Sequence, residues 1–316
     1  GLNMNANINE DLNFTAQIVA AGSENETADS WSNWDMQADW LFVKWQVNDN
    51  FSIKGGRQLY NAWLAAEYID VGALIPWRQA PGQVYALSPF KSFEGVSFDY
   101  ITELSGLRLK TSLFGGAIHN NRGQLVGEFA RMRVVDGDKL IGAVAVLEGK
   151  GWQLKGSASR MNYAGSYSYS ADEDATPNPQ DYEINEGIAY TIGFNYTRDW
   201  VIWAEYGHTS GTGTSTFSNP YTGKDHDFGK YGEAFYATLG RKINKWLPHF
   251  TYAYGNYRFG YAEGIQKSYL SGLNYQMYPN AVVKLAYEVE NATGSGVMLS
   301  QKGAAQVASV GIDFLF

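Results

Sequence analysis

The chain has 316 residues and a formal net charge of −8, from 24 Lys+Arg and 32 Asp+Glu, and charged residues make up only 18% of it. It contains no cysteine, which excludes a disulfide framework, cysteine-based metal sites and a thiol nucleophile. The acidic balance without a basic block argues against nucleic acid as a partner, and the longest apolar run, 140–147, is too short for a membrane-spanning helix.

Most of the chain alternates apolar residues with polar or small ones at period two, which predicts β-strands with one apolar and one polar face. The first such segment alternates Leu2, Met4, Ala6 and Ile8 with asparagines. In chain order we expect fifteen strands, around residues 2–8, 12–18, 41–47, 51–53, 96–100, 107–113, 140–147, 152–160, 188–196, 200–206, 235–239, 250–254, 269–275, 283–289 and 310–316. The sequence therefore predicts an all-β protein.

The connections between these strands alternate in length. Short turns rich in Asn, Asp and Gly are expected at 9–11, 48–50, 103–106, 149–151, 197–199, 244–246 and 278–280. Long loops are expected between them, at 22–34, 60–91, 118–138, 165–186, 210–231, 258–264 and 291–304. Short turns on one rim and long loops on the other are typical of a transmembrane antiparallel β-barrel, with short periplasmic turns and long extracellular loops. The alternative is a soluble all-β protein whose aromatic residues fill a core.

The strand count predicts a further strand. Single-chain bacterial barrels have an even number of strands and begin and end on the short-turn side. Fifteen strands are one short of that pattern, so we expect a first strand before Gly1 and a barrel of 16 strands, treated as a single domain over residues 1–316. A barrel of that size encloses an aqueous channel, and the polar faces of the strands agree with such a lumen.

The residues around loop 60–91, the second long loop of this sequence, resemble those of a known protein family. Gly56-Arg57 at a strand end resembles the Gly-Arg signature of Gram-negative outer-membrane porins. Further motifs resemble one proteobacterial branch of them, namely Asp39-Trp40, Asp70-Val71-Gly72, Pro76-Trp77, Val84-Tyr85 and Gly95-Val96. The C-terminal Phe316 resembles the terminal aromatic residue of such barrels. The resemblance implies a homotrimer in the outer membrane of a Gram-negative bacterium, with outer-membrane lipid and lipopolysaccharide around it. It also implies that loop 60–91, the third long loop of such a barrel, folds into the lumen and forms the constriction.

Loop 60–91 has a composition that agrees with this expectation. It is too apolar to be disordered, so it must bury side chains such as Trp63, Leu64 and Trp77 against the inner wall of the barrel. We expect its charged residues to face basic strand residues across the lumen and so to create a transverse field. The predicted constriction residues are Lys54, Arg57, Glu67, Asp70, Arg78, Asp99, Arg108 and Lys110. Arg57 is the first choice because it matches the porin signature; the alternative is a structural arginine.

Other chemistry is sparse, and the sequence predicts no catalytic residue and no cofactor. The acidic segments 172–174 and 224–227 could loosely bind a divalent cation at the extracellular loops. The function that the sequence favours is passive diffusion of small hydrophilic solutes and ions through a porin channel. A substrate-selective channel, a barrel that acts as a sleeve or receptor for another protein, and an enzyme within a barrel remain alternatives; for the last, His208 and His249 have no obvious serine partner.

Overall fold

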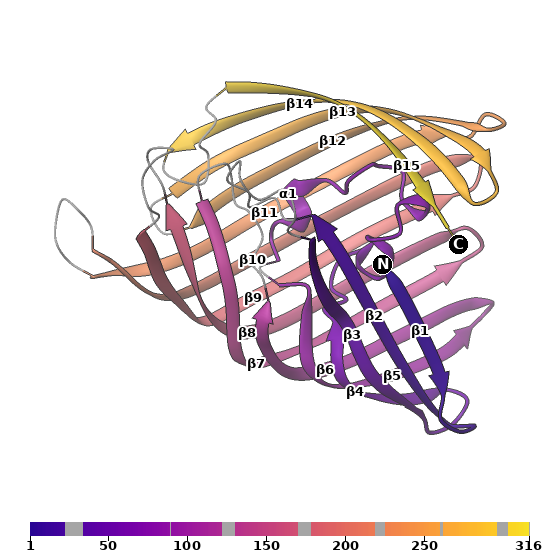
Figure 1. The fold of residues 1–316 in the computed structure, drawn as a ribbon, viewed down its shortest axis with the longest axis horizontal. Helices are drawn as coiled ribbons and strands as arrows, with labels where there is room; N and C mark the ends of the chain where they lie inside the picture. Colours follow the sequence, from indigo (N-terminus) through magenta and orange to yellow (C-terminus); the bar gives the residue numbers. More distant parts are fainter. Residues whose placement is uncertain are drawn as a thin grey trace.

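The computed structural model describes residues 1–22, 34–88, 90–121, 130–169, 178–218, 225–259, 262–295 and 303–315 of the chain. Almost all of the regular structure in these residues is β-strand (Figure 1). The strands are β1 (Leu2–Asn7), β2 (Leu12–Gly22), β3 (Trp34–Gln46), β4 (Phe51–Leu59), β5 (Ser92–Leu104), β6 (Leu107–Asn121), β7 (Ala130–Gly149), β8 (Trp152–Tyr169), β9 (Asn178–Thr197), β10 (Trp200–Ser218), β11 (Asp225–Arg241), β12 (Trp246–Phe259), β13 (Ala262–Tyr278), β14 (Ala281–Ser295) and β15 (Gly303–Phe314). The helical elements are three short turns between β4 and β5: η1 (Ala66–Tyr68), η2 (Gly72–Leu74) and α1 (Gly82–Tyr85). No helix in the described ranges is long and apolar enough to cross a membrane.

The fifteen strands form one antiparallel sheet in which every strand pairs with its neighbour in sequence. The sheet curls around an interior, and the segment that carries α1 lies inside the curl (Figure 1). This confirms the all-β class and the strand count. Within the described residues β1 and β15 are the edges of the sheet and do not pair with each other, so closure by a sixteenth strand stays a prediction.

The short turns lie where the sequence predicts them, but several strands are longer than expected. For example, β7 and β9 each have 20 residues and extend into segments that the sequence pattern assigns to loops. These extensions lack the apolar and polar alternation that identifies a strand lying half in lipid, yet their backbones continue the hydrogen-bonded ladder. Hydrophobic periodicity therefore finds only the part of each strand that carries an apolar face.

The two faces of the sheet differ in chemistry, and the register shows which residues share a face. Residues directly opposite each other in an antiparallel pair point to the same side. The row Trp45, Ile53 and Phe98 is apolar, and Trp45 and Phe98 are nearly half exposed. The neighbouring row, Lys44, Lys54 and Ser97, is polar and faces the interior of the curl, where loop 60–91 lies. An apolar outside and a polar inside are the pattern of a membrane barrel.

The main buried cluster lies inside the barrel, between loop 60–91 and the inner face of the sheet. Trp77 is fully buried and packs edge-on against the rings of Trp203 on β10 and Tyr236 on β11. Its indole N–H lies 2.9 Å from Thr238 Oγ1 and 3.0 Å from Thr251 Oγ1. A large aromatic residue on the loop is thus buried among side chains of three consecutive strands, β10 to β12.

We predict that Trp77→Ala destabilises the barrel more than Trp45→Ala does. Truncating a buried tryptophan leaves a cavity and costs roughly 3–5 kcal/mol, whereas Trp45 is 48% exposed on the outer face. Thermal unfolding of both variants in the same detergent measures the difference. Equal losses in the two variants would contradict the placement of Trp77 in the buried cluster.

Candidate functional site

The candidate site is the interior of the barrel, where loop 60–91 meets the inner wall. The loop leaves β4, crosses the inner face of the sheet and returns to β5. Its apolar side chains are buried, and Trp63, Leu64, Trp77, Val84 and Leu87 are each at most 4% exposed. Leu74 differs, because it remains half exposed at η2. As the sequence predicts, the apolar residues of the loop are mostly buried against the wall.

Three glycines on the inner face of neighbouring strands make room for the loop. A Cβ atom at Gly193 on β9 would lie 3.0 Å from the Cβ of Leu64, and one at Gly207 on β10 would lie 2.5 Å from the ring of Trp63. A Cβ atom at Gly232 on β11 would lie 2.5 Å from Leu87. Real Cβ atoms essentially never approach other atoms within 3.0 Å, so larger residues at Gly207 and Gly232 would force the side chains of Trp63 and Leu87 to shift.

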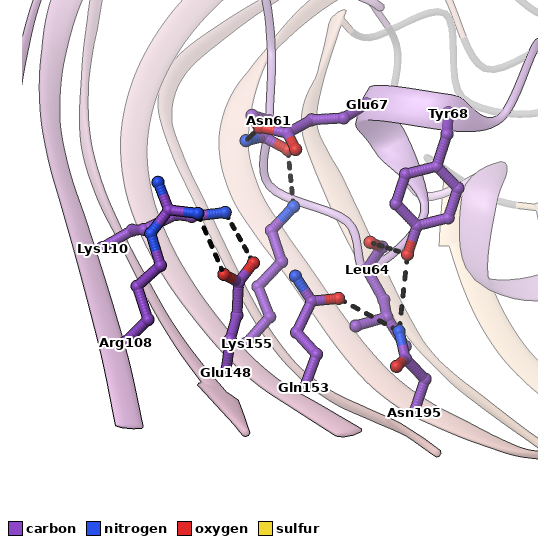
Figure 2. A network of polar contacts seen from close by, with 10 residues as sticks. All are labelled: Asn61, Leu64, Glu67, Tyr68, Arg108, Lys110, Glu148, Gln153, Lys155 and Asn195. Atoms are coloured by element: carbon purple, nitrogen blue, oxygen red, sulfur yellow. Dashed lines mark hydrogen bonds and ion pairs between the residues drawn. The ribbon is translucent and has the colours of Figure 1, made fainter. Parts of the chain in front are cut away.

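Two buried ionisable side chains bind the first part of the loop. Lys155 on β8 donates to Asn61 Oδ1 at 2.5 Å and to the carbonyl of Trp63 at 2.6 Å. Figure 2 shows its ammonium group directed at Asn61. Glu205 on β10 accepts the backbone N–H of Leu64 at 2.6 Å and the hydroxyl of Tyr236 at 3.2 Å. These contacts satisfy loop backbone groups that burial would otherwise leave without partners.

A third buried side chain, Lys284 on β14, binds the middle of the loop. Its ammonium group donates to the carbonyls of Gly72, Ile75 and Trp77, at 2.5, 3.0 and 2.7 Å. It also lies 3.0 Å from Asp313 of β15, and its side chain is only 2% exposed. All three ammonium donors are therefore used within the protein, which holds the stretch around η2 against the last two strands.

Tyrosines near the two ends of the loop add neutral hydrogen bonds. The hydroxyl of Tyr60 lies 2.5 Å from Ser159 Oγ on β8, and burial raises the pKa of Tyr60 to about 12. The hydroxyl of Tyr85 accepts the N–H of Ala65, and burial raises its pKa well above the usual range. Both hydroxyls therefore stay protonated over the physiological pH range, and the contacts do not depend on pH there.

Charged residues of both signs lie side by side on the inner wall from β4 to β7. Lys54 forms an ion pair with Asp99 at 2.9 Å. Lys110 contacts Glu148 at 2.6 Å, and Arg108 lies 3.9 Å from the same carboxylate. Figure 2 shows Arg108 and Lys110 converging on Glu148, with Lys155 and Asn61 next to them. The acids that pair with these bases are therefore mainly on the wall itself and not across the lumen.

The structure gathers some of the predicted constriction residues and separates others. Lys54, Asp99, Lys110 and Glu67 line one cavity of about 180 Å³ at the base of the loop, and Arg108 lies on the same strand as Lys110. Glu67 accepts a hydrogen bond from Asn61 at 2.6 Å. The other two charged loop residues lie apart: Asp70 is 3.8 Å from Lys91 at the return of the loop, and Arg78 lies near Gly311 of β15.

Arg57 occupies a different place from the one expected. In the register it pairs with Leu41 and Glu94, so it shares the outer face of the sheet with the exposed residues Leu41 and Val96. Its guanidinium lies 2.6 Å from Glu94. The expectation that Arg57 faces the lumen is thus corrected. The physical reason is strand alternation, because Arg57 lies an odd number of positions after the inward Lys54 on the same strand.

The side chains that hold the loop are not among the predicted site residues. The sequence pattern identifies Lys155 and Lys284 only as polar lumen residues, and it does not single out Lys44, Glu148 or Glu205. Alternation along β10 already places Glu205 on the face opposite Ile202 and Tyr206. The sequence gives no signal for the partners of Lys155, Glu205 and Lys284, because those partners include backbone groups of a loop far away in the chain.

The acidic segments proposed as cation sites lie largely outside the described residues. Residues 172–174 and Lys224 are not described, and the C-terminal Phe316 is not described either. The divalent cation therefore stays a prediction.

Solved structures of outer-membrane proteins resemble this chain in fold. OmpT of Vibrio cholerae, in its trimer form, matches with a TM-score of 0.56 at 12% identity, over 98% of this chain and 86% of that one. OmpF of Salmonella typhi, in complex with daunomycin, matches at 0.55 and 14% identity, over 99% and 88% of the two chains. The outer-membrane channel DcaP of Acinetobacter baumannii matches at 0.52 and 13% identity, over 98% and 82%. No protein-family model and no curated protein sequence matches the chain. The chain thus has the fold of outer-membrane β-barrels, while the specific porin branch stays a prediction.

We predict that Lys284→Met loosens the middle of the loop. The variant leaves the three carbonyls of Gly72, Ile75 and Trp77 without their charged donor, and backbone groups that lose a buried partner cost about 1–3 kcal/mol each. Amide hydrogen exchange over residues 71–77 is therefore expected to become faster. Lys150→Met serves as the matched control, because Lys150 is exposed in the short turn between β7 and β8 and does not line the cavities beside the loop. Unchanged exchange in Lys284→Met would show that this contact does not hold the loop.

Proposed function

We propose that the chain forms a water-filled channel for passive diffusion of small hydrophilic solutes and ions across the outer membrane of a Gram-negative bacterium. The proposal includes a homotrimer surrounded by outer-membrane lipid and lipopolysaccharide, and no enzymatic activity. It rests on the barrel fold, on the resemblance to porins and on the likeness to DcaP, which is an outer-membrane channel. The trimer is supported by the trimer form of OmpT.

One observation carries the proposal. Loop 60–91 is bound to the inner face of β8 to β15 through Lys155, Glu205 and Lys284, so it narrows the interior along that side. The inner wall from β3 to β7 instead presents the ion pairs of Lys54 and Lys110 together with hydroxyl groups. A passage lined by charged and polar groups beside a fixed loop is suited to hydrated solutes, since polar linings replace part of their hydration.

The direct test is conductance in a planar lipid bilayer. The purified, folded chain is expected to insert in steps and to give ohmic current through an open pore. A solute-swelling assay in proteoliposomes with neutral sugars of increasing size then measures the width of the passage. Insertion without conductance would contradict the proposal and would favour a barrel that acts as a sleeve or receptor for another protein.

Measurements of ion selectivity distinguish the roles of the two basic residues of β4, Lys54 and Arg57. We predict that Lys54→Ala shifts the reversal potential in a salt gradient towards cation preference, because it removes an inward positive charge. Arg57→Ala is expected to leave the reversal potential unchanged, since its side chain lies on the outer face. Reversal potentials are recorded for both variants under the same conditions, so that each variant serves as the control for the other. A shift in Arg57→Ala as large as that in Lys54→Ala would contradict the assignment of faces.

A further inference from the structure

Two lysines stand directly opposite each other on the inner wall of the barrel. Lys44 of β3 and Lys54 of β4 are register partners, and both line the cavity at the base of loop 60–91. Like charges directly opposite each other on one face of a sheet destabilise the pair. The chain therefore places two positive charges together where an acidic or neutral partner would be more stable.

The carboxylates around the pair compensate only one of the two lysines at close range. Lys54 has Asp99 at 2.9 Å, and the neighbouring Lys110 has Glu148 at 2.6 Å. In the described part of the chain no carboxylate lies within 4.0 Å of the Lys44 ammonium group. Three lysines, Lys44, Lys54 and Lys110, line the cavity together with the acids Asp99 and Glu67. Glu148 lies beside it between Lys110 and Arg108, so the four bases at and beside the cavity exceed the three acids by one positive charge.

The rest of the cavity lining provides neutral hydrogen-bonding groups. Ser52, Ser97 and Ser112 line it, and Ser52 and Ser97 are buried. Ser97 donates to Gln58 at 2.6 Å, which fixes that amide in the wall. Ammonium groups and the hydroxyls of Ser52 and Ser112 are donors of the kind that bind the oxygen atoms of small anions, whereas the hydroxyl hydrogen of Ser97 is used by Gln58. The cavity volume, about 180 Å³, is sufficient for such an ion with some of its water.

We propose that Lys44 and Lys54 form a binding subsite for small oxyanions, such as inorganic phosphate or a carboxylate, inside the channel. The subsite gives the pore a preference for anions over cations. An anion between the two ammonium groups offsets their mutual repulsion, which explains why both are tolerated in register. This inference rests on the proposed channel function and adds the class of solute that the channel favours.

The first experiment measures selectivity and block in planar bilayers. Lys44→Gln and Lys54→Gln are each expected to lower the chloride-to-potassium permeability ratio by up to roughly 16-fold. Coulomb's law gives a factor of about four for one unit charge about 5 Å away in water, and that factor acts on chloride and on potassium in opposite directions. Added inorganic phosphate is expected to reduce the chloride current of the wild type in a saturable way, and less so in either variant. Lys44→Arg should retain both effects. Lys150→Gln is the matched control, because this lysine lies in an exposed short turn and lines none of the cavity.

The second experiment measures phosphate binding without current, by equilibrium dialysis of labelled inorganic phosphate against the folded protein in detergent. Wild type and Lys150→Gln are expected to bind phosphate, and the double variant Lys44→Gln/Lys54→Gln is expected to lose binding. A heat-modifiability gel checks that each variant is folded. Open channels without phosphate binding and with unchanged selectivity in the glutamine variants would overturn the subsite and leave the channel function intact. Phosphate binding that needs both lysines, in a barrel that conducts no ions, would support the subsite and overturn the channel.

Discussion

The structure depends on one constraint: an apolar loop of 32 residues lies inside a barrel whose inner wall is polar. The wall must therefore supply hydrogen-bond partners for the loop backbone, and the loop must supply them for the buried polar side chains of the wall. Burying the tryptophans and leucines of the loop removes its backbone groups from water as well. Lys155, Glu205 and Lys284 satisfy several of those groups from the wall, and Gly193, Gly207 and Gly232 leave room for the side chains. Ionisable side chains buried without such partners would be strongly destabilising, so the loop and these three ionisable residues require each other.

The same constraint divides the interior into two parts. The wall from β8 to β15 is occupied by the loop, and its charged residues serve to bind backbone. The wall from β3 to β7 keeps its lysines and carboxylates at a cavity, where they can meet a solute. Any passage through the barrel is therefore lined asymmetrically, with one more basic than acidic side chain at the base of the loop once Arg108 and Glu148 are counted. The ion preference of such a passage depends on these few residues and not on the net charge of −8 of the whole chain.

Sequence patterns predict the parts of this arrangement that depend on local periodicity. The alternation of apolar and polar residues identifies fifteen strands and their short turns, and the apolar composition of residues 60–91 predicts a loop buried against the wall. For Arg57 the family signature points to the lumen, whereas alternation from Lys54 indicates the outer face. The sequence does not predict strand ends such as those of β7 and β9, because their residues pair through the backbone but do not alternate apolar and polar side chains. The roles of Lys155, Glu205 and Lys284 cannot be predicted from the sequence either, since each binds backbone groups at least 92 residues away in the chain.

The central claim is that loop 60–91 rests on the inner wall in the conducting state, and an engineered disulfide tests it most directly. The chain has no cysteine, and a Cβ at Gly193 would lie 3.0 Å from the Cβ of Leu64, close to the separation of about 3.5–4.5 Å that a disulfide spans. In the variant Leu64→Cys/Gly193→Cys we expect oxidation to join loop and wall within one chain, with the same single-channel conductance before and after reduction. Failure of the two cysteines to react, or a conductance that changes when they do, would show that the loop occupies another position in the open channel.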